Sequence, residues 1–372
     1  MKYLFLLLLI SAIAFISCSS EKDYPVKITE ENGVKTVSNP DYPKEGVYDL
    51  VLDELFTLGK DEDNSKYIFA RYLFIDIDNR FNLYVYDSEG CKIFKFDKAG
   101  NYVSQFGRHG QGPGDFGQFV IFRVSPDDKI IINDLFNRRI CWFDLNGNYL
   151  DGLIYRDQLS FINLDSKGNI YCVKESYDNI DKLTDQPQFI ASTKSILRFN
   201  LKTNEWDTVG SFRGEKHRML IDKRGGYSSH GPYNEFIWNI SPDNLLFTGF
   251  ADTYELSVYD LKGKLKYKFN RKFTPSLNPA FGERKQPQYL RALNQFSLFD
   301  NNGNYWSALD YGGLPEYYIY EIFSKDGVFL KKVYSKYQIR LIKEDKAYSI
   351  VYSKTDPVYV KAFKYSLKKR EK

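Results

Sequence analysis

Residues 72–106 read YLFIDIDNRFNLYVYDSEGCKIFKFDKAGNYVSQF, and this stretch decides the fold. It holds four short runs rich in aromatic and β-branched residues, which favour strands because such side chains pack well on a pleated surface. Polar turns such as Asp76-Ile77-Asp78-Asn79 and Asp97-Lys98-Ala99-Gly100 separate the runs and suit tight reversals. Four antiparallel strands joined in this way form one blade of a β-propeller.

The same pair of turns recurs along the chain at intervals of about fifty residues, which is the sequence signature of a repeat architecture. Turns of the first kind begin at Asp76, Ser125, Asp165, Ser241, Asp300 and Lys343. Turns of the second kind begin at Asp97, Asp144, Asn200, Asp260 and Ser324. The pattern therefore predicts an all-β, six-bladed β-propeller. Seven blades are the alternative, but the sequence shows no seventh pair of turns.

The last blade lacks an outer strand in its own stretch of sequence, because the chain ends in the basic tail Leu367–Lys372. An open edge in an otherwise closed ring would invite pairing with other chains. The segment Val47–Leu58 precedes the first blade, is strand-like and has no other role in the repeat. We expect this N-terminal segment to complete the sixth blade and close the ring.

Strand order assigns the connections to two faces of the propeller. The short Asp/Asn/Gly turns share one face, and the connections of variable length share the other, which we call the long-loop face. Loops beyond about twelve residues in a compact domain are usually functional, so we expect the site there. The longest connections expected on this face are Gly107–Gln118, Lys174–Thr193, Arg213–Glu235 and Arg271–Asn294.

The N-terminus is predicted to be a targeting segment. Lys2 is followed by an almost wholly apolar run from Leu4 to Ile16, which is short for a membrane-spanning helix. The run ends at Phe15-Ile16-Ser17-Cys18, which resembles a bacterial lipobox and makes Cys18 the expected lipid attachment site. An ordinary cleaved signal peptide is the alternative. We expect a signal peptide at 1–17, a lipidated polar spacer at 18–45 and the propeller at 46–372.

A glycine-rich segment, Phe106-Gly107-Arg108-His109-Gly110-Gln111-Gly112-Pro113-Gly114-Asp115-Phe116, links the first two blades. It has two interpretations. Its backbone N–H groups could bind an anion with Arg108 and His109 as partners, or its glycines could serve a structural turn by adopting positive φ. No Gly-Lys-Ser/Thr follows, so it is not a P-loop.

This segment, the blade turns and the lipobox-like start resemble the NHL-like six-bladed β-propeller lipoproteins of Bacteroidota. In that family an inter-blade Phe-Gly-x-x-Gly-x-Gly-Pro-Gly-Glu-Phe segment follows the first blade, and here Asp115 stands in place of the glutamate. The resemblance spans nearly the whole mature chain. It implies a propeller fold and export to the cell envelope, with a binding or scaffold role and no assigned reaction.

Composition and motifs reduce the number of function classes that the chain fits. With 52 Lys plus Arg against 48 Asp plus Glu, the chain lacks the basic excess of a nucleic-acid binder, so no nucleic-acid partner is expected. The 3 histidines match no metal spacing, and no cofactor, metal site or catalytic residue is assigned. Cys91, Cys141 and Cys172 are expected to be small buried hydrophobes, with a disulfide between two of them as the alternative.

These observations favour a binding module over an enzyme. We expect a protein tethered to the outer membrane by its lipid, on the periplasmic or the surface side, that binds a glycan or an envelope protein on its long-loop face. The alternative is a metal-assisted lyase or hydrolase at the mouth of the channel. The candidate ligand-binding residues are Arg108, His109, Gln111, Asp115, Arg139, Arg213, His217, Arg218, His230 and Tyr233.

Overall fold

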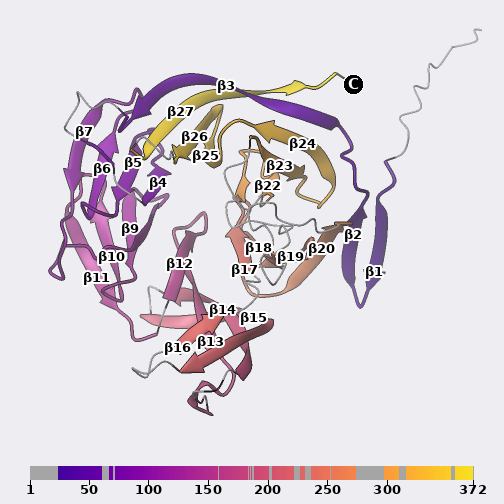
Figure 1. Ribbon diagram of the computed structural model, residues 1–372, viewed down its shortest axis with the longest axis horizontal. Helices are drawn as coiled ribbons and strands as arrows, with labels where there is room; N and C mark the ends of the chain where they lie inside the picture. Colours follow the sequence, from indigo (N-terminus) through magenta and orange to yellow (C-terminus); the bar gives the residue numbers. More distant parts are fainter. Residues whose placement is uncertain are drawn as a thin grey trace, which may run out of the picture.

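Five β-sheets surround a central axis in the computed structural model (Figure 1). The structure describes residues 24–60, 67–69, 72–157, 159–182, 184, 186, 188–200, 203–221, 227–230, 236–251, 253–273, 297–309, 316–352 and 357–371. Cys18 and the expected signal peptide lie outside these residues. Within the described part of the chain, no helix is long and apolar enough to span a membrane.

Blades one and two are separate four-stranded antiparallel sheets. Blade one contains β4 (Leu73–Ile77), β5 (Leu83–Asp87), β6 (Lys92–Phe96) and β7 (Tyr102–Phe106). Blade two contains β8 (Val120–Val124), β9 (Lys129–Asp134), β10 (Arg139–Asp144) and β11 (Tyr149–Ile154). The inner strands β4 and β8 contact each other, as neighbouring blades of a propeller must.

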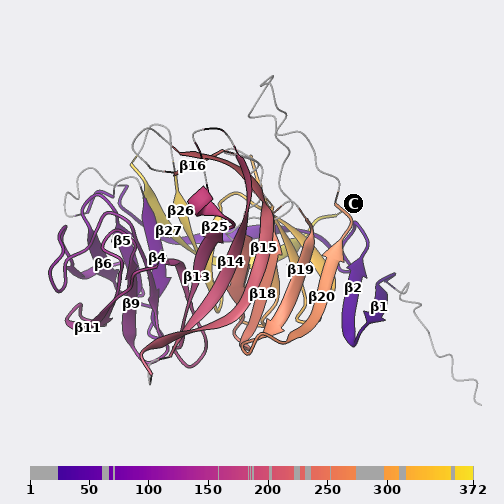
Figure 2. The same ribbon diagram turned by 90° about the horizontal axis from the view of Figure 1, so that it is seen from below.

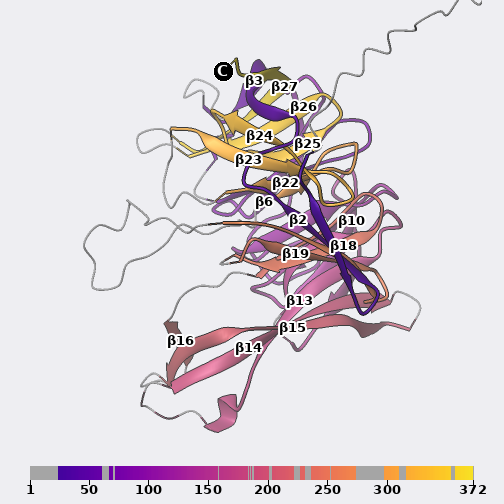
Figure 3. The ribbon, with the colours of Figure 1, turned by 90° about the vertical axis from the view of Figure 1, so that its right-hand side faces the viewer.

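Blade three extends further than the sequence predicted. It contains β12 (Leu159–Leu164), β13 (Ile170–Tyr177), β14 (Gln188–Asn200), β15 (Glu205–Ile221) and a fifth strand, β16 (Tyr227–His230), with the 3₁₀ helix η1 (Ile180–Lys182) after β13. The expected loops Lys174–Thr193 and Arg213–Glu235 therefore contain strand, and those two expectations are wrong. The lengthened β14 and β15 project beyond the neighbouring blades (Figures 2 and 3).

An N-terminal strand pairs with the outer strand of blade four and another with the outer strand of blade five. Blade four contains β17 (Phe236–Ile240), β18 (Leu245–Phe250), β19 (Glu255–Asp260) and β20 (Leu265–Arg271). The hairpin of β1 (Lys27–Glu31) and β2 (Val34–Asn39) adds to its outer edge, where β2 runs parallel to β20. The segment expected as a polar spacer thus includes a docked hairpin. Blade five contains β21 (Leu298–Phe299), β22 (Tyr305–Ala308), β23 (Tyr318–Phe323) and β24 (Phe329–Ser335).

The sixth blade confirms the predicted closure by an N-terminal strand. It contains β25 (Ile339–Lys343), β26 (Lys346–Val351) and β27 (Tyr359–Lys369), and its outer strand is β3 (Gly46–Leu58). Antiparallel pairing joins β3 to β27 from Leu58 opposite Val360 to Tyr48 opposite Lys369. The first residues of β3 also pair in parallel with β24, so blades five and six form one eight-stranded sheet.

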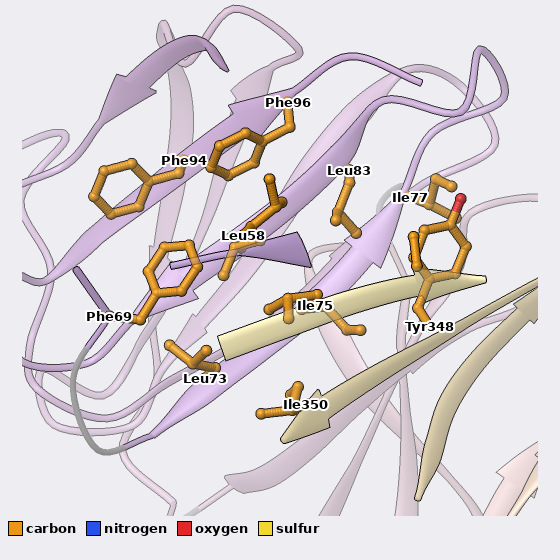
Figure 4. Close-up of a cluster of buried hydrophobic side chains, with 13 residues drawn as sticks. Leu58, Phe69, Leu73, Ile75, Ile77, Leu83, Phe94, Phe96, Tyr348 and Ile350 are labelled. Carbon is orange, nitrogen blue, oxygen red and sulfur yellow. The ribbon is translucent and has the colours of Figure 1, made fainter. Parts of the chain in front are cut away.

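A hydrophobic cluster fills the junction where the ring closes (Figure 4). Leu58 of β3 lies among Leu73 and Ile75 of β4 and Tyr348 and Ile350 of β26. These side chains come from both ends of the chain and are each less than one-tenth exposed. Because burial of such side chains is the main force that drives folding, this cluster joins the first blade to the last.

The predicted turns have a common geometry. Asp97 Oδ1 accepts hydrogen bonds from the backbone N–H groups of Ala99 and Asn101, both at 2.9 Å, and Oδ2 accepts one from Asn101 Nδ2. Asp144 and Asn148 repeat the arrangement in blade two. These side chains satisfy the backbone donors of the reversal, which is why aspartate begins so many of the turns.

Candidate functional site

The glycine-rich segment folds into a compact turn on the long-loop face between blades one and two. Gly107 has φ +88°, and a Cβ placed on it would lie 2.1 Å from Phe116 Cε2. Phe116 itself is fully buried among the side chains of blades one and two. Only glycine fits at position 107, because the aromatic ring occupies the space that a side chain would need.

Four backbone N–H groups of this turn, those of Gly110, Gly112, Asp115 and Phe116, donate hydrogen bonds within it. Gly110 N donates to Phe116 O at 3.0 Å, and Phe116 N donates to Arg108 O at 2.7 Å. Gly112 N donates to Asp115 Oδ2 at 2.9 Å. Since these donors are already satisfied, the geometry favours the structural interpretation of the segment over an anion-binding nest.

The Arg139 side chain donates hydrogen bonds to three backbone carbonyls of this turn. Its Nη1 donates to Gln111 O at 2.7 Å and to Gly112 O at 3.1 Å, and its Nη2 donates to Asp115 O at 2.8 Å. The guanidinium also forms an ion pair with the fully buried Asp134, with Nε 3.4 Å from Oδ2. Arg139 is only 12% exposed, so among the candidate residues it acts here as a brace for the turn.

Three candidates remain at the surface of the turn. The Arg108 side chain is 80% exposed and donates from Nε to Asp115 Oδ1 at 2.7 Å. That hydrogen bond is the main reason why the pKa of Asp115 lies below its usual range. His109 and Gln111 are exposed beside it. Arg108, His109 and Gln111 are thus presented to solvent, whereas Asp115 is buried as an internal acceptor.

The second group of candidates lies on the extension of blade three. Arg213 is exposed and donates from Nη2 to Asp178 Oδ2 at 2.5 Å. His217 and Arg218 lie in β15, and Arg218 is directly opposite His230 of β16 in the ladder. The candidates therefore form two groups on different blades rather than one cluster. Tyr233 lies outside the described residues.

The extension has a small core of its own. Ile190 of β14 and Met219 of β15 are buried against each other, and Tyr177 and Ile180 pack on them. Lys194 and Glu175 form an ion pair across β13 and β14. This satellite cluster explains how strands can continue beyond the body of the propeller.

Exposed aromatic side chains lie at the long-loop end of the first or second strand in blades one, two, three and six, and no sequence motif distinguished them. They are between 36% and 66% exposed, and they lie directly before an inner strand, within one, or next to the second strand of a blade. Phe161 has φ +52° at a bulge of β12, and bulges commonly redirect a side chain. We call these residues the mouth aromatics: Tyr72, Phe119, Phe136, Phe161 and Tyr352.

Polar residues link the inner strands nearer the opposite end of the channel. Asp76 Oδ1 accepts the N–H of Ile77 at 2.9 Å, and Oδ2 accepts the N–H of Val124 in the next blade at 2.8 Å. Asn239 repeats the local bond, while its Nδ2 donates to Ser297 O in blade five. Burial raises the pKa of Asp76. Position 76 is thus a carboxylate that accepts the N–H of Val124 in the next blade. Position 239 is an amide that donates to the carbonyl of Ser297 in the next blade.

Cys91, Cys141 and Cys172 are buried and carry free thiols, which confirms the expectation of small buried hydrophobes. Burial raises the pKa of Cys141 to about 11. Within the residues that the structure describes, no three His, Cys, Asp or Glu side chains are grouped so as to hold a metal ion.

Comparison with known proteins agrees with the fold. A protein of Bacteroides fragilis described as exported has 12% identity and a TM-score of 0.54, with 90% of this chain and 100% of that chain covered. A member of the DUF4221 family from Bacteroides vulgatus has 12% identity and a TM-score of 0.55, with 88% and 100% covered. A search of the curated proteins finds no match.

The family comparison is more specific than these structural similarities. Residues 73–269, which begin with β4 and end within β20, match the DUF5128 family, described as a 6-bladed β-propeller. The match covers just over half of the chain and includes the first four blades. The chain therefore belongs to the DUF5128 family of six-bladed β-propellers.

Proposed function

We propose that this protein is an exported, lipid-anchored binding module that binds a glycan at the mouth of its channel on the long-loop face. The observation that carries the proposal is the group of mouth aromatics around the ends of the inner strands. Aromatic rings present flat apolar faces with large contact areas, which suit the C–H faces of sugar rings. The exposed Arg138 lies in the same blade-two turn as Phe136 and could pair with an acidic sugar.

The export part of the proposal rests on the N-terminal sequence. The apolar run and the Ser17-Cys18 junction fit lipidation of Cys18 and tethering to the outer membrane, as in the NHL-like lipoproteins that the chain resembles. The similar fold of a Bacteroides fragilis protein described as exported is in keeping with this. A lipid anchor would leave the long-loop face available to an extracytoplasmic ligand.

Glycan binding is tested by calorimetric titration of neutral and acidic oligosaccharides into residues 21–372. Tyr72→Ala and Phe119→Ala should each weaken binding about tenfold or more, because each removes a stacking surface. Tyr42→Ala is the matched control, since Tyr42 is 52% exposed but lies beside the hairpin of β1 and β2. Binding that the mouth variants leave unchanged would place the site elsewhere, and a lack of binding to every oligosaccharide would point to an envelope protein as the ligand.

The anchor has its own test. Cys18→Ala should move the full-length protein from the membrane fraction to the aqueous fraction after cell lysis. Digestion of intact cells with an added protease should then distinguish the periplasmic side from the surface side. Unchanged partitioning of the variant would contradict lipidation without affecting the glycan proposal.

A further inference from the structure

At two junctions between successive blades, a phenylalanine at the same register position packs against the following blade. Phe106 lies opposite Ile93 in blade one, and Phe269 lies opposite Leu256 in blade four, so the two rings occupy equivalent places. Each packs beneath a turn glycine of the following blade. A Cβ on Gly147 would lie 2.3 Å from Phe106 Cγ, and a Cβ on Gly327 would lie 2.9 Å from Phe269 Cγ.

The junction of blades two and three departs from this arrangement. Leu153 stands at the equivalent place, opposite Ile140. The turn that follows in blade three has Asn204, with φ +58°, as its positive-φ residue, where blades two and five use Gly147 and Gly327. The phenylalanine ring that fills the junction of blades one and two and that of blades four and five is therefore missing from this one.

A pocket of about 220 Å³ lies at this junction. A cavity of roughly 150 Å³ can hold a benzene ring, so the space suits one aromatic ring. Leu153 and Trp206 belong to the same hydrophobic cluster as the buried Leu159, and all three line the pocket. Their side chains supply the apolar part of the lining, including the aromatic ring of Trp206.

The rim of the pocket carries charge. Arg156 and Asp157 lie on the connection from β11 to β12 and are exposed. Asp157 forms an ion pair with Lys174 at 2.8 Å, whereas Arg156 has no ion-pair partner among the described residues. A cation next to an apolar ring site favours a ligand with an anionic group, because arginine pairs well with carboxylates.

We propose that this pocket binds an aromatic ring that carries a carboxylate. The ring would take the place that Phe106 and Phe269 occupy at their own junctions, against Trp206, and the carboxylate would pair with Arg156. This site is on the outer wall between blades two and three and is independent of the glycan proposed at the channel mouth.

The test is ligand-observed NMR titration of residues 21–372 with phenylacetate and with benzyl alcohol as the neutral analogue. Leu153→Phe should fill the pocket from within and abolish binding of both compounds. Leu150→Phe is the matched control, because Leu150 lies on the same strand but is half exposed and does not line the pocket. Arg156→Gln should weaken phenylacetate about two- to fivefold, the range of an exposed ion pair, and leave benzyl alcohol unchanged.

Phenylacetate binding that is lost in Leu153→Phe and kept in Leu150→Phe would support the proposal. An absence of phenylacetate binding, or equal binding by wild type and Leu153→Phe, would overturn it. Leu153→Phe should keep the wild-type circular dichroism spectrum and melt no lower than Leu150→Phe, so that lost binding reports on the pocket itself. Phenylacetate binding that Arg156→Gln leaves unchanged would overturn the assignment of the carboxylate to Arg156.

Discussion

Gly100, in the outer turn of blade one, packs directly on the ring of Phe56 in β3: a Cβ on Gly100 would lie 2.6 Å from Phe56 Cγ. Gly147 packs on Phe106 of the preceding blade in the same manner. The N-terminal strand thus presents to blade one the kind of contact that blade one presents to blade two. By this criterion β3 acts as the outer strand of an ordinary blade, although it precedes the first blade in the sequence.

Substitution of Gly100 should therefore destabilise the ring closure. Gly100→Ala combines an unfavourable φ of +87° with a clash against Phe56 and should lower the free energy of unfolding by more than about 1 kcal/mol. Gly114→Ala is the control, because Gly114 has φ +82° but nothing within 4 Å of its Cβ position. Urea unfolding of both variants separates the clash from the backbone strain. Adding Phe56→Ala should remove most of the difference between them, and strictly additive effects would contradict the contact.

Arg139 should be essential for the glycine-rich turn. Arg139→Gln removes the hydrogen bonds to three backbone carbonyls and leaves Asp134 buried without its ion pair, so a loss of about 3 kcal/mol is expected. Arg108→Gln should change the urea midpoint little, because Arg108 is largely solvated. Equal destabilisation by the two substitutions would show that the turn depends on its surface pair instead.

Asn39 should stabilise the packing of the N-terminal hairpin against blades four and five. Its Nδ2 donates to Gly327 O at 2.8 Å and to Asn270 O at 3.1 Å, and its Oδ1 accepts the N–H of Phe329 at 2.8 Å. Asn39→Ala would leave buried groups unsatisfied and should cost about 2 kcal/mol. Thr29→Ala, at an exposed position of β1, provides the control. Hydrogen exchange of β2 should accelerate in Asn39→Ala alone; protection equal to wild type would argue against this role.

Acid should destabilise the protein through the Asp/Asn/Gly turns on the face opposite the long-loop face. The pKa of Asp97 is lowered by the Asn101 side chain and by backbone N–H groups, and the pKa of Asp260 is lowered by the N–H of Lys264. Groups with a lowered folded pKa stabilise the protein above their unfolded pKa, and this contribution is lost as the pH falls through the folded value. The urea midpoint should therefore drop below about pH 4. The double variant Asp97→Asn, Asp260→Asn should show a shallower drop, since asparagine still accepts the backbone bonds without titrating, whereas exposed Asp41→Asn should follow wild type.

The blades could be predicted because the Asp, Asn and Gly residues of each turn are themselves the signal for a reversal of the chain. The closing strand could be predicted because the strand-like segment Val47–Leu58 has no other role in the repeat. The hairpin of β1 and β2 was missed, although Asn32-Gly33, with φ of +51° and +75°, is a typical hairpin turn. The charged residues of Lys27–Glu31 hid that signal, because every one of them is exposed and shows no apolar alternation. The long β14 and β15 were missed for a related reason: their outer halves pair mainly with each other, around the small core of Ile190 and Met219.

The candidate site was less predictable than the fold. The sequence identified the glycine-rich turn, but it could not show that Asp115 and Arg139 would face inward. It also gave no reason to choose Tyr72 or Phe119 among 59 Tyr and Phe residues (30 + 29). Their exposure follows from a position directly before an inner strand, which is known only once the strand boundaries are known.

The pairing of β3 with β27 also sets an order of events in time. Residues 46–58 leave the ribosome long before their antiparallel partner, Val360–Lys369, has been synthesised. Until β27 has been made, the ring remains open. Leu58 of β3 and Leu73 of β4 then lack the side chains of β26 and β27 that pack in the same cluster. Contacts between such distant segments form slowly, because the intervening chain must be closed into a loop. The strand that completes the propeller is therefore also the one that delays its completion, until β27 has been synthesised.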